Sequence, residues 1–177
     1  MQRQNKLASF EEAVLPHLDA AYNLARWLTR DEADADDVVQ EAFLRAFRYF
    51  GGFNQSMEGR PWLLGIVRNT CYTWMRQNRA QEVLVPFDES HDLESHDLSP
   101  EALLLQSADR QAVRQALEEL PVEFREVMVL RELEGMSYKE IAGITDLPIG
   151  TVMSRLARAR KRLQQSLTGH TRAEVRS

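Results

Sequence analysis

The stretch Ser137–Leu163 reads SYKEIAGITDLPIGTVMSRLARARKRL, and its pattern decides the fold. Ser137 and Glu140 have the spacing of a capping box and predict the start of a short helix. Asp146 follows where the chain needs a left-handed residue to turn, and aspartate is one of the few residues besides glycine that tolerate this conformation, at about 1 kcal/mol. A longer helix is predicted to begin near Thr151. This order of signals is typical of a helix-turn-helix.

The side chains of this stretch predict how its two helices pack. Small or apolar residues stand where the helices of the motif approach each other or bury a face, namely Ile141, Ala142, Leu147, Val152, Leu156 and Leu163. The second helix presents a face that can meet base edges and phosphates, made of Thr151, Met153, Ser154, Arg155, Arg158 and Arg162. A helical hairpin with a solvated basic face is the alternative. The cap, the turn, the anchors and the basic helix occur in the expected order, which favours DNA binding.

Helical periodicity extends over most of the remaining chain, so we expect an all-α fold. The predicted helices run from a capping box at Ser9 and Glu12 to Thr29 with a break at Pro16, from a cap at Asp34 to Gly51-Gly52, from Pro61 to about Arg79, from Ser99-Pro100 to Leu120, and from Pro121 to Gly135. Residues 81–98 lack periodicity and are rich in acids and serine, which is the composition of a flexible linker. The sequence therefore predicts two small helical domains, residues 8–80 and 99–167, joined by this linker and followed by a frayed tail, residues 168–177.

Composition excludes several classes of protein. The chain has 177 residues, of which 44% are hydrophobic, one cysteine and four histidines. A single cysteine cannot form an internal disulfide, and the histidines have no metal-ligand spacing, so we expect a reducing compartment, no metal and no cofactor. No stretch resembles a signal peptide or approaches the roughly 20 apolar residues of a membrane span, which places the protein in the cytoplasm.

Charge is strongly segregated along the chain, although the net charge is only −5. An acidic cluster spans residues 31–41, whereas the charged residues from Arg60 to Arg79 are all arginines. Residues 82–109 carry only acids, and the charged residues from Arg155 to Arg162 are all basic. Two basic helical segments on a mostly acidic body suggest two DNA-facing modules.

Three stretches together resemble the extracytoplasmic-function sigma factors, the small promoter-specificity subunits of bacterial RNA polymerase. They are DDVVQEAF at 36–43, WLLGIVRN at 62–69, and MSYKEIA at 136–142 continuing through IGTV at 149–152 and SRL at 154–156. The resemblance covers nearly the whole chain. It implies that the first domain binds the polymerase clamp and the downstream promoter element, and that the helix-turn-helix reads the upstream element.

The resemblance also implies roles for residues of the first domain. The polymerase-binding helix would use Asp36, Asp37, Gln40, Glu41, Phe43 and Arg45, since carboxylates and amides pair with a basic and polar partner surface. Solvation alone is the alternative for this acidic face. The downstream-promoter surface would use Arg60, Trp62, Arg68, Asn69, Arg76 and Arg79. Asn69 and Trp62 lie where the family captures an unstacked base, so binding of single-stranded DNA could drive melting. The alternative for Trp62 and Trp74 is a place in the hydrophobic core, which is common for tryptophans at this helical spacing.

The sequence departs from the family at Met153, a position often filled by lysine or arginine, so one upstream contact is lost or becomes apolar. The sequence of the base-capture loop, residues 54–59, does not indicate which DNA bases the loop would bind. His91 and His96 lie in the linker and are expected to be solvated. The resemblance implies three partners: core RNA polymerase at its beta-prime clamp and beta flap, promoter DNA, and a cognate anti-sigma factor that is often tethered to the membrane. No catalytic residue and no small-molecule substrate are expected.

Two other classes of protein remain open on sequence alone. A conventional helix-turn-helix regulator with an N-terminal dimerisation module would bind a paired DNA site by itself. A structural helical adaptor would not use its basic residues on DNA. A sigma factor differs from both because it needs core polymerase for tight promoter binding.

Overall fold

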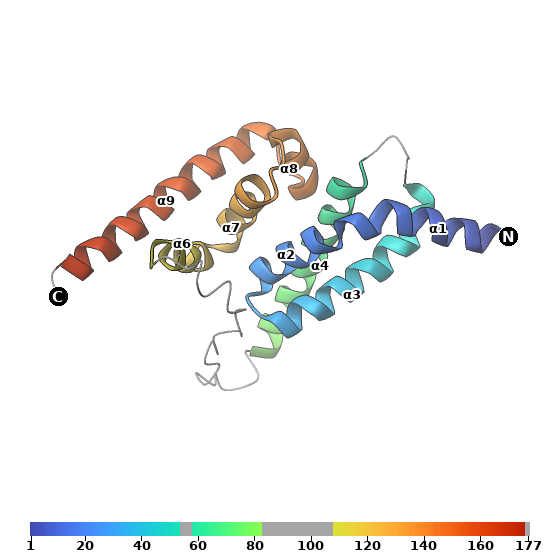
Figure 1. Cartoon of the computed structure of the whole chain (residues 1–177), viewed down its shortest axis with the longest axis horizontal. Helices are drawn as coiled ribbons and strands as arrows, with labels where there is room; N and C mark the ends of the chain where they lie inside the picture. The colour runs from blue at the N-terminus through green and yellow to red at the C-terminus, as the bar shows by residue number, and fades with distance from the viewer. Residues whose placement is uncertain (54–57, 83–107, 176–177) are drawn as a thin grey trace.

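The computed structural model describes residues 1–53, 58–82 and 108–175, and its secondary structure in these ranges is helical, as predicted (Figure 1). The first half contains α1 (Gln2–Val14), η1 (Leu15–His17), α2 (Leu18–Thr29), α3 (Glu32–Tyr49), η2 (Phe50–Gly52) and α4 (Gly59–Glu82). The second half contains α6 (Ala108–Glu119), α7 (Val122–Met128), a π-helical turn η3 (Val129–Leu133), α8 (Tyr138–Thr145) and α9 (Ile149–Val175).

Several predictions lie outside the described residues. These are nearly all of the linker 81–98 with His91 and His96, the predicted helix start at Ser99-Pro100, and positions 54–57 of the base-capture loop. The side chain of Arg79 is also outside the description.

The starts of two helices differ from the sequence prediction. Ser9 lies inside α1, where its Oγ donates to the Asn5 carbonyl at 2.9 Å, so Ser9 and Glu12 do not form a capping box. Asp31, not Asp34, caps α3, because its Oδ1 accepts the Asp34 N–H at 3.0 Å. Both errors have one cause: a side chain that can cap is also tolerated inside a helix, and the amide it reaches decides its role.

The break at Pro16 is confirmed, since the 3-10 turn η1 separates α1 from α2. Helices α2, α3 and α4 then pack around a shared core, with these fully buried side chains among its members: Leu24, Leu28, Val38, Leu63, Leu64 and Val67. An aromatic cluster closes the end of this core. In it the Trp62 ring lies 4.8 Å from the Phe53 ring and 6.2 Å from the Phe50 ring, so Trp62 is partly a core residue.

The helix-turn-helix forms as the sequence predicts. Ser137 Oγ accepts the Glu140 N–H at 3.1 Å while Glu140 Oε2 accepts the Ser137 N–H at 3.2 Å, which completes the capping box. Asp146 has φ 56° and ψ 43°, the left-handed conformation expected of it. Helix α9 begins at Ile149, slightly before Thr151, and it continues to Val175. The helix thus extends beyond residue 167, where the sequence pattern predicts it to fade, and residues 168–175 contain no proline to end it.

The two halves pack against each other rather than standing apart (Figure 1). Helix α8 contacts α4, and α7 contacts α2. Gly65 lies where α4 faces α8, and a Cβ atom there would make an ordinary van der Waals contact, at 3.9 Å, with the Ile144 Cα. The buried side chains of both halves consequently form one continuous hydrophobic cluster.

Candidate functional site

Helix α9 presents a basic outer face held in place by a buried inner face. Val152 and Leu156 are almost fully buried against the rest of the second half. The side chains on the opposite side are exposed, and they are Met153, Ser154, Arg158 and Arg162. A helix with this arrangement can enter the major groove and place its outer side chains on phosphates and base edges.

Two of these arginines are partly positioned by neighbours. Arg158 Nη2 lies 3.4 Å from the Ser154 Oγ, one helical turn back, and the Arg162 guanidinium lies 5.2 Å from the centre of the Phe124 ring. Both arginines remain exposed, so they can exchange these contacts for phosphate oxygens. Thr151 and Arg155 are only half-exposed, which makes them less accessible than the sequence pattern suggests.

Helix α3 carries the acidic face expected to meet a protein partner. Asp36, Asp37 and Gln40 are exposed. Glu41 is half-exposed, and its Oε1 accepts from Arg45 Nε at 3.1 Å within the same helix. Phe43 is turned inward, where its ring meets the Phe10 ring edge-on at 6.5 Å. The structure therefore leaves a carboxylate-rich surface accessible and gives Phe43 a packing role.

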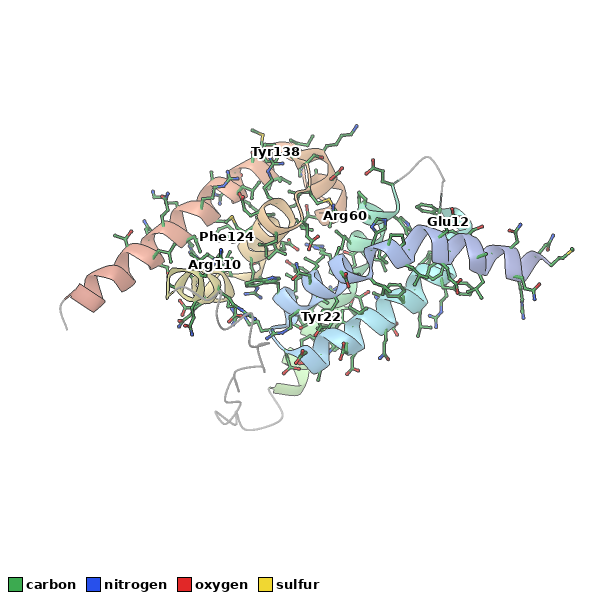
Figure 2. All side chains as sticks on the ribbon, in the orientation of Figure 1. Glu12, Tyr22, Arg60, Arg110, Phe124 and Tyr138 are labelled. Atoms are coloured by element: carbon green, nitrogen blue, oxygen red, sulfur yellow. The ribbon has the colours of Figure 1, made fainter. Side chains whose placement is uncertain are left out.

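Helix α4 divides the predicted downstream-promoter residues into two groups. Asn69 and Arg76 are exposed. Arg60 and Arg68, in contrast, are directed at the second half of the chain, and Figure 2 shows Arg60 where the two halves meet. The sequence could not show this difference, because all four residues lie on one helix with the same basic pattern.

Arg68 forms a two-point ion pair with Glu126 of α7. Its Nε lies 2.9 Å from Glu126 Oε2 and its Nη2 lies 3.2 Å from Glu126 Oε1. The Glu126 side chain is 0% exposed and that of Arg68 is 18% exposed. Burial alone would lower the pKa of the Arg68 guanidinium, but the hydrogen bonds and charge of Glu126 outweigh it and raise that pKa. Arg68 is thus a cation held by a carboxylate from the other half.

Further polar contacts join the halves on either side of this pair. Arg60 Nη2 donates to Glu134 Oε2 at 2.8 Å, and Asn23 Nδ2 donates to Glu134 Oε1 at 2.7 Å. Buried Arg125 donates to the Leu28 carbonyl of α2 at 3.3 Å. Burial and repulsion by Arg30 lower the pKa of Arg125 to about 10, which still leaves it charged at neutral pH.

Sequence reasoning assigns no role to Glu126, Glu134 or Arg125. A signal was present for two of them, since Arg125 and Glu126 stand in the run FREVMVL, where most neighbours are apolar. Charged side chains within an apolar helix face are rarely buried unless they are paired. Their partners could not be identified in this way because they lie in the other half of the chain.

A groove of about 580 Å³ lies between α2 and α6. Its lining combines four arginines and one glutamate with apolar side chains, and it includes Arg26, Arg30, Arg110, Arg114, Glu118, Trp27 and Leu133. Glu118 is paired with Arg114 at 3.4 Å, so the arginines outnumber the acid. Such a surface suits a segment that is both acidic and apolar. Two further findings hold for the part of the chain that the structure describes: no helix is long and apolar enough to cross a membrane, and no cluster of metal-ligating side chains occurs.

These features are typical of one class of protein, the helical DNA-binding proteins with a helix-turn-helix, and the acidic face of α3 is accessible to a protein partner. Comparison with known families agrees in both halves. The model for Sigma-70 region 2 matches residues 13–81, and the model for Sigma-70, region 4 matches residues 110–163. The second match contains the whole helix-turn-helix, and the first contains α2, α3 and most of α4.

Individual relatives give the subfamily. The chain is 38% identical over 141 residues to the ECF RNA polymerase sigma-E factor of Escherichia coli K12, covering 76% of this chain and 74% of that protein. It is 34% identical over 174 residues to the RNA polymerase sigma-H factor of Pseudomonas aeruginosa, covering 94% and 90%. The chain therefore belongs to the extracytoplasmic-function (ECF) RNA polymerase sigma factors, which direct polymerase to promoters.

A solved structure supports the fold as well. The chain is similar, with a TM-score of 0.74 and 31% identity, to the sigma factor RpoE of Bartonella quintana in complex with the anti-sigma factor NepR. The similarity covers 90% of this chain and 97% of that one. The all-α, two-region architecture predicted from sequence is confirmed.

Proposed function

We propose that this sigma factor binds core RNA polymerase through the acidic face of α3, reads the upstream promoter element with α9, and opens the downstream element with α4. The observation that carries the proposal is the exposure, on one chain, of a carboxylate-rich helix and a basic recognition helix. The clamp and flap of polymerase are the partner surfaces. The chain acts in the cytoplasm as a binding subunit, not as an enzyme, and it uses no small-molecule substrate.

Strand opening is assigned to the segment around Asn69. This residue is exposed on α4, and the partly buried Trp62 ring lies on the same helix. An exposed amide can bond the edge of an unstacked base, and a neighbouring aromatic ring can pack against it. Binding of the opened strand would thus supply the free energy of melting without ATP.

Run-off transcription with purified core polymerase and a promoter library tests the proposal. We expect starts that depend on this chain and that map to a shared pair of promoter elements. Absence of such starts across a broad library would contradict the proposed function. A footprint made by the chain alone on a paired site would favour a conventional helix-turn-helix regulator instead.

Arg158→Ala is expected to weaken promoter binding roughly tenfold at moderate salt, since an exposed arginine that neutralises a phosphate releases counterions. The slope of log affinity against log salt should fall by about 1. Holoenzyme binding to labelled promoter DNA over a salt series measures both quantities. Arg160→Ala is the matched control, because Arg160 on the same helix is already paired with Glu132 at 2.8 Å. Equal effects of the two substitutions would contradict the assigned contact.

Glu41→Ala is expected to weaken holoenzyme assembly about tenfold while leaving DNA contacts unchanged, since it removes a carboxylate from the proposed polymerase-binding face. Fluorescence titration of the labelled chain with core polymerase gives the affinity. Glu12→Ala removes an exposed carboxylate from α1 and serves as the control. Intact assembly of the Glu41→Ala chain would show that α3 is not the polymerase-binding helix.

A cognate anti-sigma factor, tethered to the membrane, is the proposed regulator. The solved relative from Bartonella quintana is bound to an anti-sigma factor, and the arginine-lined groove between α2 and α6 suits an acidic amphipathic helix. The inhibitor should co-purify with the tagged chain from membranes and abolish run-off transcription when added back. Arg26→Glu and Arg114→Glu together should restore transcription in its presence. If the co-purified protein does not inhibit run-off transcription, and the two substitutions have no effect in its presence, the proposed anti-sigma regulator is wrong.

A further inference from the structure

Helix α9 carries large apolar side chains on its exposed side. Ile149 is 45% exposed and Met153 is 51% exposed, and they lie about one helical turn apart. Ala157, a further turn along the helix, is exposed as well. Val152 and Leu156 of the same helix are turned the other way and are almost fully buried. Ile149, Met153 and Ala157 therefore form an apolar stripe outside the core.

The position of this apolar stripe on α9 determines what it can meet. In a helix-turn-helix the N-terminal residues of the second helix contact the base edges. Ile149 and Met153 are the first and fifth residues of α9. Arg158 and Arg162 follow toward the C-terminus, and both are exposed and able to bind phosphates beside the groove. The apolar stripe thus lies where bases are contacted, next to arginines that can hold the helix on the DNA backbone.

The chemistry of the base edges selects one base for the apolar stripe. In the major groove guanine presents two acceptors, adenine an acceptor and a donor, and cytosine a donor, whereas thymine presents an acceptor and a C5 methyl group. Neither the Met153 thioether nor the Ile149 alkyl group can donate a hydrogen bond. A polar base edge covered by these side chains would lose water without gaining a partner, which costs free energy. Thymine is the base that offers them an apolar group.

We propose that Ile149 and Met153 are specificity-determining residues that bind the C5 methyl groups of thymines in the upstream promoter element. The proposal rests on the proposed function, because α9 must lie on promoter DNA. The two residues are separated by about 6 Å along the helix axis, and successive bases of one DNA strand by about 3.4 Å. The upstream element should therefore contain two thymines about one or two base pairs apart, on the same strand or on opposite strands.

Removal of single methyl groups from the DNA tests the proposal. Run-off mapping with the promoter library first gives the upstream element. Each thymine of that element, on both strands, is then replaced in turn by deoxyuridine, which lacks only the C5 methyl group. Holoenzyme affinity for each labelled duplex is measured at one fixed salt concentration. We expect one or two replacements to weaken binding by about fourfold each, the loss of one buried methyl contact. Deoxyuridine between the two promoter elements should have no effect.

Variants of the protein identify the side chain that contacts each methyl group. Met153→Ala should weaken binding to the thymine duplex and abolish the fourfold effect of deoxyuridine at one position, and Ile149→Ala should do the same at the other. Both residues are exposed, so these substitutions should leave the fold intact. Met153→Lys should shift the preference at its position from thymine toward guanine, since lysine can donate to guanine O6 and N7. Arg160→Ala is the control, because Arg160 is paired with Glu132, and it should keep both deoxyuridine effects.

Equal affinity for the thymine and deoxyuridine duplexes at every position would overturn the proposal, as would an upstream element without thymine on either strand. Deoxyuridine effects that persist in both alanine variants would also contradict it, because another residue would then contact the methyl groups. Failure of run-off transcription would contradict the proposed function and this proposal with it. Chain-dependent starts from promoters that bind equally well with deoxyuridine would leave the proposed function intact and overturn the thymine contacts alone.

Discussion

Leu156→Ala is expected to lower the free energy of unfolding by about 3 kcal/mol, with loss of upstream promoter binding in proportion to the fraction unfolded. Leu156 is 1% exposed and belongs to the hydrophobic cluster that supports α9. Its truncation removes buried methyl groups and leaves a cavity that the neighbouring helices can only partly fill. Because small domains are only marginally stable, this loss is a large fraction of the total.

Urea denaturation followed by circular dichroism measures the effect, and Met153→Ala supplies the comparison on the same helix. Met153 is 51% exposed, so its truncation should change the free energy of unfolding by no more than about 0.5 kcal/mol. If both substitutions cost the same, the orientation of α9 in the helix-turn-helix would be wrong. A separate variant, Met153→Lys, tests whether the apolar side chain at this position weakens promoter binding.

Gly59→Ala is expected to destabilise the first half by about 2 kcal/mol, because the new methyl group has no room. A Cβ atom at this position would lie 2.5 Å from the Ala13 carbonyl oxygen of α1. The obstructing atom belongs to the backbone, so relief requires α1 and the start of α4 to move apart. Thermal unfolding of the variant should show a correspondingly lower Tm.

Gly52→Ala is the matched control for Gly59→Ala. A Cβ atom at Gly52 would meet no atom within 4 Å, and Gly52 is not among the residues with positive φ. Its substitution should be neutral or slightly stabilising, since alanine restricts the unfolded chain. A similar loss of stability at both positions would mean that general loop rigidity, rather than the approach of α1 to α4, explains the effect.

Local signals in the sequence are enough for the helix-turn-helix. The Ser137–Glu140 box, the left-handed Asp146 and the buried Val152 and Leu156 all involve residues close together in the chain. Capping and helical periodicity act over one or two turns, so the sequence pattern carries them directly. The break at Pro16 follows from the same kind of local constraint.

Helix ends are predicted less accurately from sequence, because neighbouring side chains can each act as the N-cap of a helix. Asp31 and Asp34 can both cap, and the observed cap is the one whose oxygen reaches an amide at the start of α3. The sequence pattern predicts that α9 fades after residue 167, whereas the helix continues to Val175. The lack of apolar residues there does not prevent exposed residues from continuing an existing helix.

The partners of Arg60 and Arg68 were decided by tertiary structure alone. The sequence predicts Arg68 on a basic helix and Arg60 just before it, but Arg68 meets Glu126 58 positions away and Arg60 meets Glu134 74 positions away. Which face of α4 is covered depends on how α7 and α8 dock against it. Periodicity within one helix contains no information about this placement, so these contacts become visible only when the two halves are packed together.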